Sequence, residues 1–147
     1  MYQRILVATD GSTLSKKAVG SAIELAALSQ AELVALKIVP RYPMSYFEGG
    51  VVLSSSDVKK IEQQWMEEAQ AVVDKVRDAA ARQDVSAKAV VVRSDLVAEA
   101  IIAAAKKHKC ELIVMSSHGR KGLKRVLLGS ETQHVLTNSS VPVLVLR

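Results

Sequence analysis

Glycine and hydroxyl residues with the spacing of an anion-binding loop lie between positions 116 and 130. Gly119 is followed by nine residues and then by Gly129 and Ser130. Glycine lets backbone N–H groups approach phosphate oxygens, because no Cβ stands in the way. Gly129 and Ser130 stand at the start of a predicted helix, whose free N–H groups and dipole favour an anion. This stretch therefore indicates an anion or nucleotide site.

Two residues at the start of this helix also have a purely structural interpretation. Ser130 and Gln133 fit the capping-box pattern S-x-x-Q, so Ser130 can serve simply as the cap of the helix. Both roles are compatible, since one hydroxyl can cap the free helix and meet a phosphate when a ligand arrives. Glu131 lies in the first turn, and its carboxylate has to point away from a bound phosphate.

A second polar position follows the first predicted strand. Asp10 comes directly after the apolar run 5–8 and is followed by Gly11 and Ser12. An Asp-Gly pair after a strand often forms only a turn and a helix cap. If the strands that precede Asp10 and Ser116 are neighbours, however, both polar ends line one crevice at the carboxyl edge of the sheet.

Several other chemistries lack their sequence patterns. The chain has no G-x-x-x-x-G-K-[ST] loop, no G-x-G-x-x-G after its first strand and no G-x-S-x-G elbow. His108, His118, His134 and Cys110 do not have the spacing of metal ligands, so we expect no metal site in the protein itself. No base is paired with a nucleophile, and we expect no catalytic residue.

Strands and helices alternate along the chain, and these elements must position the candidate site residues. Apolar runs predict strands over 5–8, 31–39, 87–92, 111–115 and 141–146. Apolar residues at helical spacing follow each of the first four strands and predict helices, among them one over 57–82, one capped by Ser94 or Asp95, and a short one over 130–137. Residues 41–56 have the composition of a long loop. This order predicts an α/β fold, a parallel sheet with helices on both faces.

The composition fits a single domain over residues 1–147. Of the 147 residues 49% are hydrophobic but only 3% aromatic, which predicts an aliphatic core. The formal charge of +5 is mild, and the single cysteine excludes an intramolecular disulfide. No apolar run is long enough for a membrane span and no signal peptide is recognisable, so we expect a cytoplasmic protein without membrane contact.

Three parts of the sequence resemble the universal stress protein family. They are Asp10-Gly11-Ser12 after the first strand, the loop 116–130, and the terminal segment 141–145, so the resemblance covers the whole chain. The ATP-binding branch of that family has the loop pattern G-x2-G-x9-G-[ST]. Positions 119, 129 and 130 match this pattern, whereas Ser116 replaces the first glycine, at the point of closest backbone approach beside the ribose.

The resemblance implies a Rossmann-like fold, in which an open parallel sheet has the strand order 3-2-1-4-5. It also implies that the protein binds ATP, or ADP or AMP, with Mg²⁺ carried on the phosphates. Adenine would lie by the first and second strand ends, the ribose by the fourth, and the phosphates in the glycine loop, with charge from Arg120 and Lys121 if these are not simply solvated. The residues implied in nucleotide binding are Thr9, Asp10, Ile38, Val39, Met115, Ser116, His118, Gly119, Arg120, Gly129, Ser130 and Glu131.

In this family ATP hydrolysis is slow or absent, so the resemblance implies a nucleotide-binding regulatory protein in the stress response, not an enzyme. One alternative is a member of the branch that does not bind nucleotide and acts through protein contacts, which Ser116 favours. A less favoured alternative is a nucleic-acid binder that uses Arg120, Lys121, Lys124 and Arg125, because interleaved aromatic residues are missing.

The last strand predicts a partner for the chain. Residues 141–146 are apolar at nearly every position, and an apolar edge strand left bare pairs readily with another strand. Pro142 has no N–H, so pairing would run through the residues after it. We therefore expect a homodimer in which this strand pairs with its own copy about a two-fold axis, as members of the ATP type commonly do.

Overall fold

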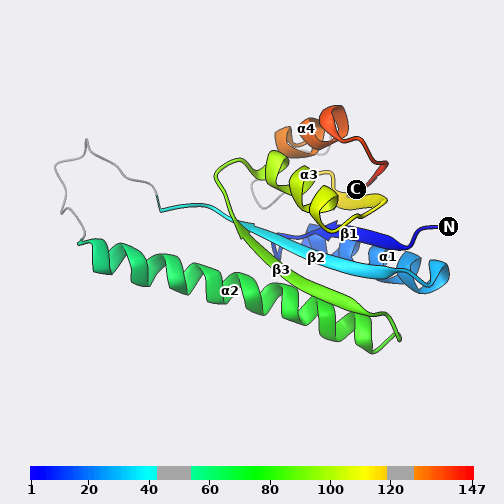
Figure 1. Cartoon of the computed structure of the whole chain (residues 1–147), viewed down its shortest axis with the longest axis horizontal. Coiled ribbons are helices and arrows are strands. Elements are labelled where there is room, and N and C mark those ends of the chain that lie inside the picture. Colours follow the sequence, from blue (N-terminus) through cyan, green and yellow to red (C-terminus); the bar gives the residue numbers. More distant parts are fainter. Residues whose placement is uncertain (43–53, 119–127) are drawn as a thin grey trace.

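Five parallel strands form one open sheet in the computed structural model, which describes residues 1–42, 54–118 and 128–147 (Figure 1). Across the sheet the strands are ordered β3-β2-β1-β4-β5, so the predicted α/β fold class and strand order are confirmed. The elements are, in chain order, β1 (Arg4–Ala8), α1 (Thr13–Ser29), β2 (Glu32–Val39), α2 (Ser55–Ala81), β3 (Ala87–Arg93), α3 (Val97–Lys107), β4 (Leu112–Ser116), α4 (Ser130–Asn138) and β5 (Val143–Leu146).

Helices cover both faces of the sheet, and alternate strand residues supply the two cores. In β1, Ile5 and Val7 face α1 and α2, whereas Leu6 between them faces α3 and α4. All three side chains are fully buried, which explains why the strand is an unbroken apolar run. The core residues are mostly Val, Leu, Ile and Ala, as the composition predicted.

Strand order reverses at β1, and this places the two polar strand ends side by side. β1 pairs with β2 on one side, with Ala8 opposite Leu36, and with β4 on the other, with Val7 opposite Val114. The segment after β1 leads into α1 on one face of the sheet, while α3 and α4 lie on the other face. In open α/β sheets a crevice forms at such a switch point, at the carboxyl ends of the strands.

Two predicted helix caps are wrong. The N-cap of helix α3 is Leu96, whose side chain makes no capping hydrogen bond. Ser94 Oγ instead accepts from the Leu96 N–H, and Asp95 Oδ1 accepts from the Arg41 N–H. Helix α4 has Gly129 as its N-cap, so Ser130 is its first residue and not its cap. In both helices the side chain expected to cap the first turn does not do so.

The longest helix, α2, buries side chains against the sheet only in its C-terminal half, while Glu62 in its N-terminal half pairs with Arg93 of β3 at 3.1 Å. Its buried residues start at Ala69, and its first turns reach beyond the end of β3 in Figure 1. Trp65 is half-buried and stacks on Tyr42 with ring centroids 5.9 Å apart. In the part of the chain that the structure describes, no helix is both long and apolar enough to cross a membrane.

Candidate functional site

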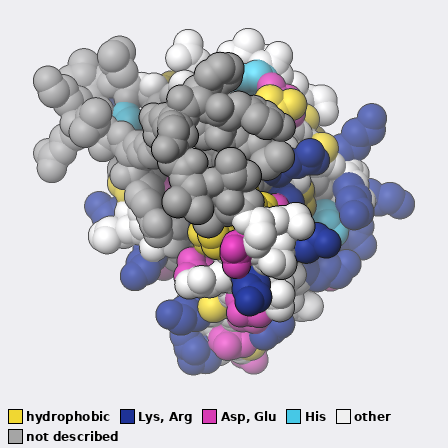
Figure 2. Space-filling model, turned by 90° about the vertical axis from the view of Figure 1, so that its left-hand side faces the viewer, with side chains coloured by type: hydrophobic (Ala, Val, Ile, Leu, Met, Phe, Trp, Pro, Cys, Tyr) yellow, Lys and Arg dark blue, Asp and Glu magenta, His cyan; other side chains and the backbone are white. Residues whose placement is uncertain are grey.

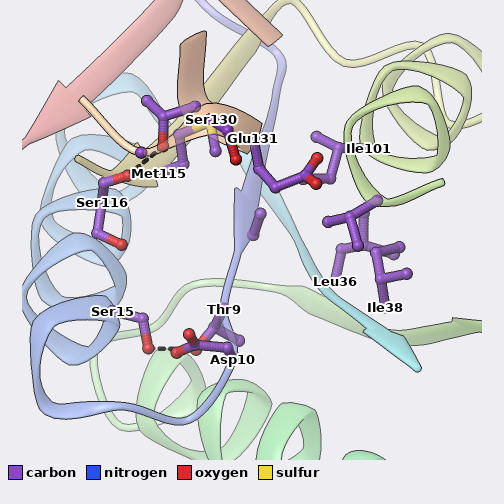
Figure 3. Close-up of a pocket in the computed structure, with 14 residues that line it drawn as sticks. Thr9, Asp10, Ser15, Leu36, Ile38, Ile101, Met115, Ser116, Ser130 and Glu131 are labelled. Carbon is purple, nitrogen blue, oxygen red and sulfur yellow. Dashed lines mark hydrogen bonds between the residues drawn. The ribbon is translucent and has the colours of Figure 1, made fainter. Parts of the chain in front are cut away.

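A cavity of about 490 Å³ lies at the switch point, between the carboxyl ends of β1, β2 and β4 and the first turns of α3 and α4 (Figure 3). This volume is in the range of small-molecule sites. The residues that line it are Ala8, Thr9, Asp10, Ser15, Leu36, Ile38, Val97, Ile101, Met115, Ser116, Gly129, Ser130, Glu131 and Thr132.

The cavity brings together most of the residues that the sequence placed in one site. Those are Thr9, Asp10, Ile38, Met115, Ser116, Gly129, Ser130 and Glu131. Val39 and His118 do not line it: Val39 is buried, and His118 Nδ1 lies 3.0 Å from the Ser117 hydroxyl. Gly119 and Arg120 lie outside the described residues, as do Lys121, Lys124 and Arg125.

Several residues that line the cavity were not predicted as site residues, although the sequence held a signal for some of them. Leu36 lies two residues before Ile38, and side chains at this spacing point to the same face of a strand. Val97 and Ile101 line the cavity from α3; apolar residues at this helical spacing indicate a buried face but do not show that it meets a ligand. Ser15 and Thr132 gave no such signal, because a buried hydroxyl in the first turn of a helix looks like a surface residue in sequence.

Buried hydroxyl groups fix the backbone where β1 ends. Ser15 Oγ donates to the Ser12 carbonyl at 2.9 Å, so in its 3.0 Å contact with Thr9 Oγ1 the serine accepts and the threonine donates. Thr9 Oγ1 in turn accepts from the Gly11 N–H, at 3.2 Å. Each hydroxyl is thus satisfied within the turn, which holds the cavity wall in one conformation.

Asp10 lies in the turn that the Asp-Gly pair predicted. Its Oδ1 accepts from the Ser12 N–H at 2.9 Å, and Gly11 takes a φ of 81°, which favours glycine. Ser12, the N-cap of α1, accepts from the Ser15 N–H. Lys37 Nζ donates to the Asp10 carbonyl at 3.3 Å, so a cation lies behind this turn although it does not line the cavity.

On the opposite wall, β4 and the start of α4 are joined by short hydrogen bonds. The Gly129 N–H donates to the Ser117 carbonyl at 2.8 Å, and Thr132 Oγ1 donates to the Ser116 carbonyl at 2.9 Å. The Ser116 hydroxyl donates to the His118 carbonyl at 2.7 Å. The N-terminus of α4 is therefore held against the end of β4, where it faces the cavity.

Two polar contacts join α4 to α3 beside the cavity. Glu131 Oε2 accepts from the Ala98 N–H at 3.0 Å, so the carboxylate points toward α3, near Ile101 in Figure 3. One turn further along α4, His134 Nε2 lies 3.2 Å from Glu99 Oε1. Glu131 thus supplies the first turn of α3 with the hydrogen-bond acceptor that its own N-cap does not provide.

The lining has an apolar side and a polar side. Leu36, Ile38 and Ile101 form an aliphatic wall, whereas Ser116 and Ser130 lie across from them (Figure 3). First-turn N–H groups of a helix lack intrahelical acceptors, and those of α4 are at the polar side. The described lining carries two carboxylates and no Lys or Arg. Such a cavity can hold a flat apolar group against one wall and a polar or anionic group against the other.

Sequence and structure comparisons identify relatives over the whole chain. The model of the universal stress protein family matches residues 1–147. Universal stress protein MJ0531 of Methanocaldococcus jannaschii is 34% identical over 149 residues, which cover 100% of this chain and 83% of that protein.

Solved structures share the fold. The structure of MJ0577, also from M. jannaschii, superposes with a TM-score of 0.84 at 25% identity and covers 99% of this chain and 96% of that one. A universal stress protein solved in complex with cAMP gives a TM-score of 0.69 at 27% identity, with 99% and 97% covered. With a family model matched along its full length and a relative this similar, the chain belongs to the universal stress protein family.

Proposed function

We propose that this protein binds an adenine nucleotide, in the first instance ATP, and acts as a nucleotide-dependent regulator in the stress response. The observation that carries the proposal is the two-sided cavity at the switch point, with an aliphatic wall on one side and the N-terminus of α4 on the other. A nucleotide has the same division, with an apolar planar base at one end and phosphates at the other.

In the proposed arrangement each part of the nucleotide meets a different strand end. Adenine lies against Ile38 and the neighbouring Leu36, with Asp10 at its edge, and the ribose lies by Met115 and Ser116. The phosphates approach the first turn of α4 at Ser130. The assignments of Gly119, Arg120, Val39 and His118 rest on the family resemblance alone.

A relative supports this ligand class. The universal stress protein solved with cAMP is 27% identical to this chain and shares its fold. Its ligand combines adenine, ribose and phosphate, which are the groups that the two-sided cavity suits.

The proposal places Mg²⁺ on the phosphates of the nucleotide and not on the protein. Among residues 1–42, 54–118 and 128–147, no cluster of three or more His, Cys, Asp or Glu side chains could hold a metal ion. Asp10 and Glu131 line the cavity, and a cation on the phosphates would reduce their repulsion of the ligand. We propose no catalytic residue, and a regulatory role that depends on nucleotide binding.

Nucleotide carried through purification tests the proposal directly. Protein purified without added nucleotide is denatured, and the supernatant is chromatographed with detection at 260 nm; we expect an adenine nucleotide peak. Titration calorimetry with ATP and Mg²⁺ then measures the affinity of the stripped protein. Absence of both the peak and any binding heat up to millimolar ATP would refute the proposal and favour a family member that acts through protein contacts.

The nucleic-acid alternative has weaker support. Figure 2 views the end of the molecule at which β2 finishes: Lys and Arg side chains gather along its right-hand rim, and Asp and Glu side chains lie among those of its lower part. The four cations of this alternative, Arg120, Lys121, Lys124 and Arg125, lie outside the described residues, so the alternative rests on the loop sequence alone.

We also propose that residues 1–147 form one domain and that this domain dimerises through β5. The five strands share one sheet, and the two cores lie against its two faces. β5 is an edge strand that pairs with β4, and its Leu144 side chain is 39% exposed. Pairing of two such edges about a two-fold axis would cover both.

A further inference from the structure

The Glu131 carboxylate lies between the N-termini of two helices that face the cavity. Glu131 belongs to the first turn of α4, and its Oε2 accepts from the Ala98 N–H in the first turn of α3, at 3.0 Å. Neither helix has a side-chain hydrogen bond from its own N-cap. In the described structure, Glu131 is thus the acidic residue of α4 whose carboxylate contacts the N-terminus of the neighbouring helix α3.

This contact fixes the direction of the carboxylate. A glutamate on an exposed helix normally swings between rotamers and can turn away from an approaching anion. Here a turn away from the cavity would break the hydrogen bond to Ala98 and leave the first turn of α3 without that acceptor. Glu131 therefore keeps a negative charge at the cavity wall while a ligand binds.

A fixed charge at this position acts on the phosphates and hardly on the base. Phosphates that bind at the first turn of α4 lie within about one helical pitch, ~5.4 Å, of the residue that follows Ser130. The repulsion grows with each added phosphate charge. The described lining holds no Lys or Arg that would offset it.

We propose that Glu131 determines which adenine nucleotide this site prefers, by penalising phosphate charge in proportion to its amount. This inference rests on the proposed function, because it assumes that an adenine nucleotide occupies the cavity. The wild-type site then favours ligands with little phosphate charge, or with phosphates neutralised by Mg²⁺, over free ATP.

The test measures the affinities of adenosine, AMP and ATP by calorimetry in low salt without Mg²⁺. E131Q removes the charge but keeps a side-chain oxygen that can accept from the Ala98 N–H. For E131Q we expect adenosine affinity within about twofold of wild type, AMP about threefold tighter and ATP about tenfold tighter, the size of charge interactions at a solvated site. Adding salt, or Mg²⁺ with ATP, should shrink the gain.

E99Q is the matched control. Glu99 carries the same charge in the first turn of α3 but pairs with His134 and does not line the cavity. We expect E99Q to change each affinity less than twofold. Thermal unfolding without ligand verifies that both variants are folded.

The outcomes separate the two proposals. An E131Q effect that is equal for adenosine and ATP, or that weakens ATP, overturns the role of Glu131 while nucleotide binding stands. An equal gain in E99Q also overturns it, because the effect would then come from overall charge. If none of the three ligands binds wild type or variants, the proposed function itself fails, and the inference with it.

Discussion

The backbone N–H of Gly129 donates to the Ser117 carbonyl at 2.8 Å, so the helix that faces the cavity rests directly on the end of β4. A Cβ built on Gly129 would lie 3.2 Å from that carbonyl oxygen and 3.5 Å from the His118 Cα. The φ of Gly129 is −59°, which any residue can adopt. A side chain here would require the Ser117 carbonyl to shift by a few tenths of an ångström, so close packing favours glycine for a reason separate from the access for phosphate that the sequence suggested.

We expect Gly129→Ala to lower the free energy of unfolding by about 1–3 kcal/mol, because the added methyl group pushes α4 away from β4. It should also weaken ATP binding, and Gly129→Val should abolish it. Gly20→Ala is the control: Gly20 lies within α1 with nothing within 4 Å of an added Cβ, so alanine should stabilise by up to about 1 kcal/mol. Urea unfolding measures both. Equal stability of the Gly129→Ala variant and wild type would contradict the packing argument.

Ser116 replaces a glycine of the ATP-binding loop pattern, and its hydroxyl donates to the His118 carbonyl. We expect Ser116→Gly to tighten ATP binding, because the backbone is freed for closer approach, and to lower stability by about 1 kcal/mol through the lost hydrogen bond. Ser116→Ala should lose similar stability without gaining affinity, since its Cβ remains. Weaker ATP binding by both variants would mean that the hydroxyl itself contacts the ligand.

The proposed dimer can be tested by removing only the free-edge donors of β5. The Pro142 and Leu146 carbonyls accept from the N–H groups of Ile113 in β4 and of Ser117 directly after it. Because backbone groups alternate along a strand, the N–H groups of Val143 and Val145 point to the free edge. We expect Val143→Pro with Val145→Pro to give a folded monomer in light scattering at tens of micromolar, where wild type is a dimer.

Leu144→Pro is the matched control for this pair, because it removes a donor on the β4 side and should reduce stability instead. A wild-type monomer would refute the dimer. A dimer that survives both edge prolines would place the interface elsewhere, with α2 as the next surface to test.

Burial of Cys110 predicts a pH dependence. Desolvation raises the pKa of its thiol from 9.0 to about 11. Because the folded-state pKa is the higher one, the stabilising contribution is complete below pH 9 and is lost as the pH rises toward 11. Wild type should therefore lose stability more steeply than Cys110→Ala over this range in urea unfolding. At pH 8 a thiol reagent should modify native Cys110 far more slowly than the unfolded chain; parallel pH slopes and equally fast modification would contradict the assignment.

The sequence by itself determined the order of strands and helices and the residues at the strand ends. The apolar runs 5–8 and 111–115 reappear as β1 and β4, and α2 lies within two residues of the predicted 57–82. These features are local, since side-chain period and burial on both faces are visible in neighbouring residues. The prediction that Asp10 and Ser116 share a crevice also held, because both line the cavity at the switch point.

Only the tertiary structure decided how the helix ends are satisfied and what closes the cavity. The sequence suggested Ser94 or Asp95 for α3, yet the acceptor for Ala98 comes from Glu131, 33 residues away. Ser15 and Thr132 enter the lining for the same reason: their partners, Thr9 and the Ser116 carbonyl, belong to other elements. A hydroxyl or carboxylate can satisfy itself with any nearby donor or acceptor, and packing alone determines which one comes within reach.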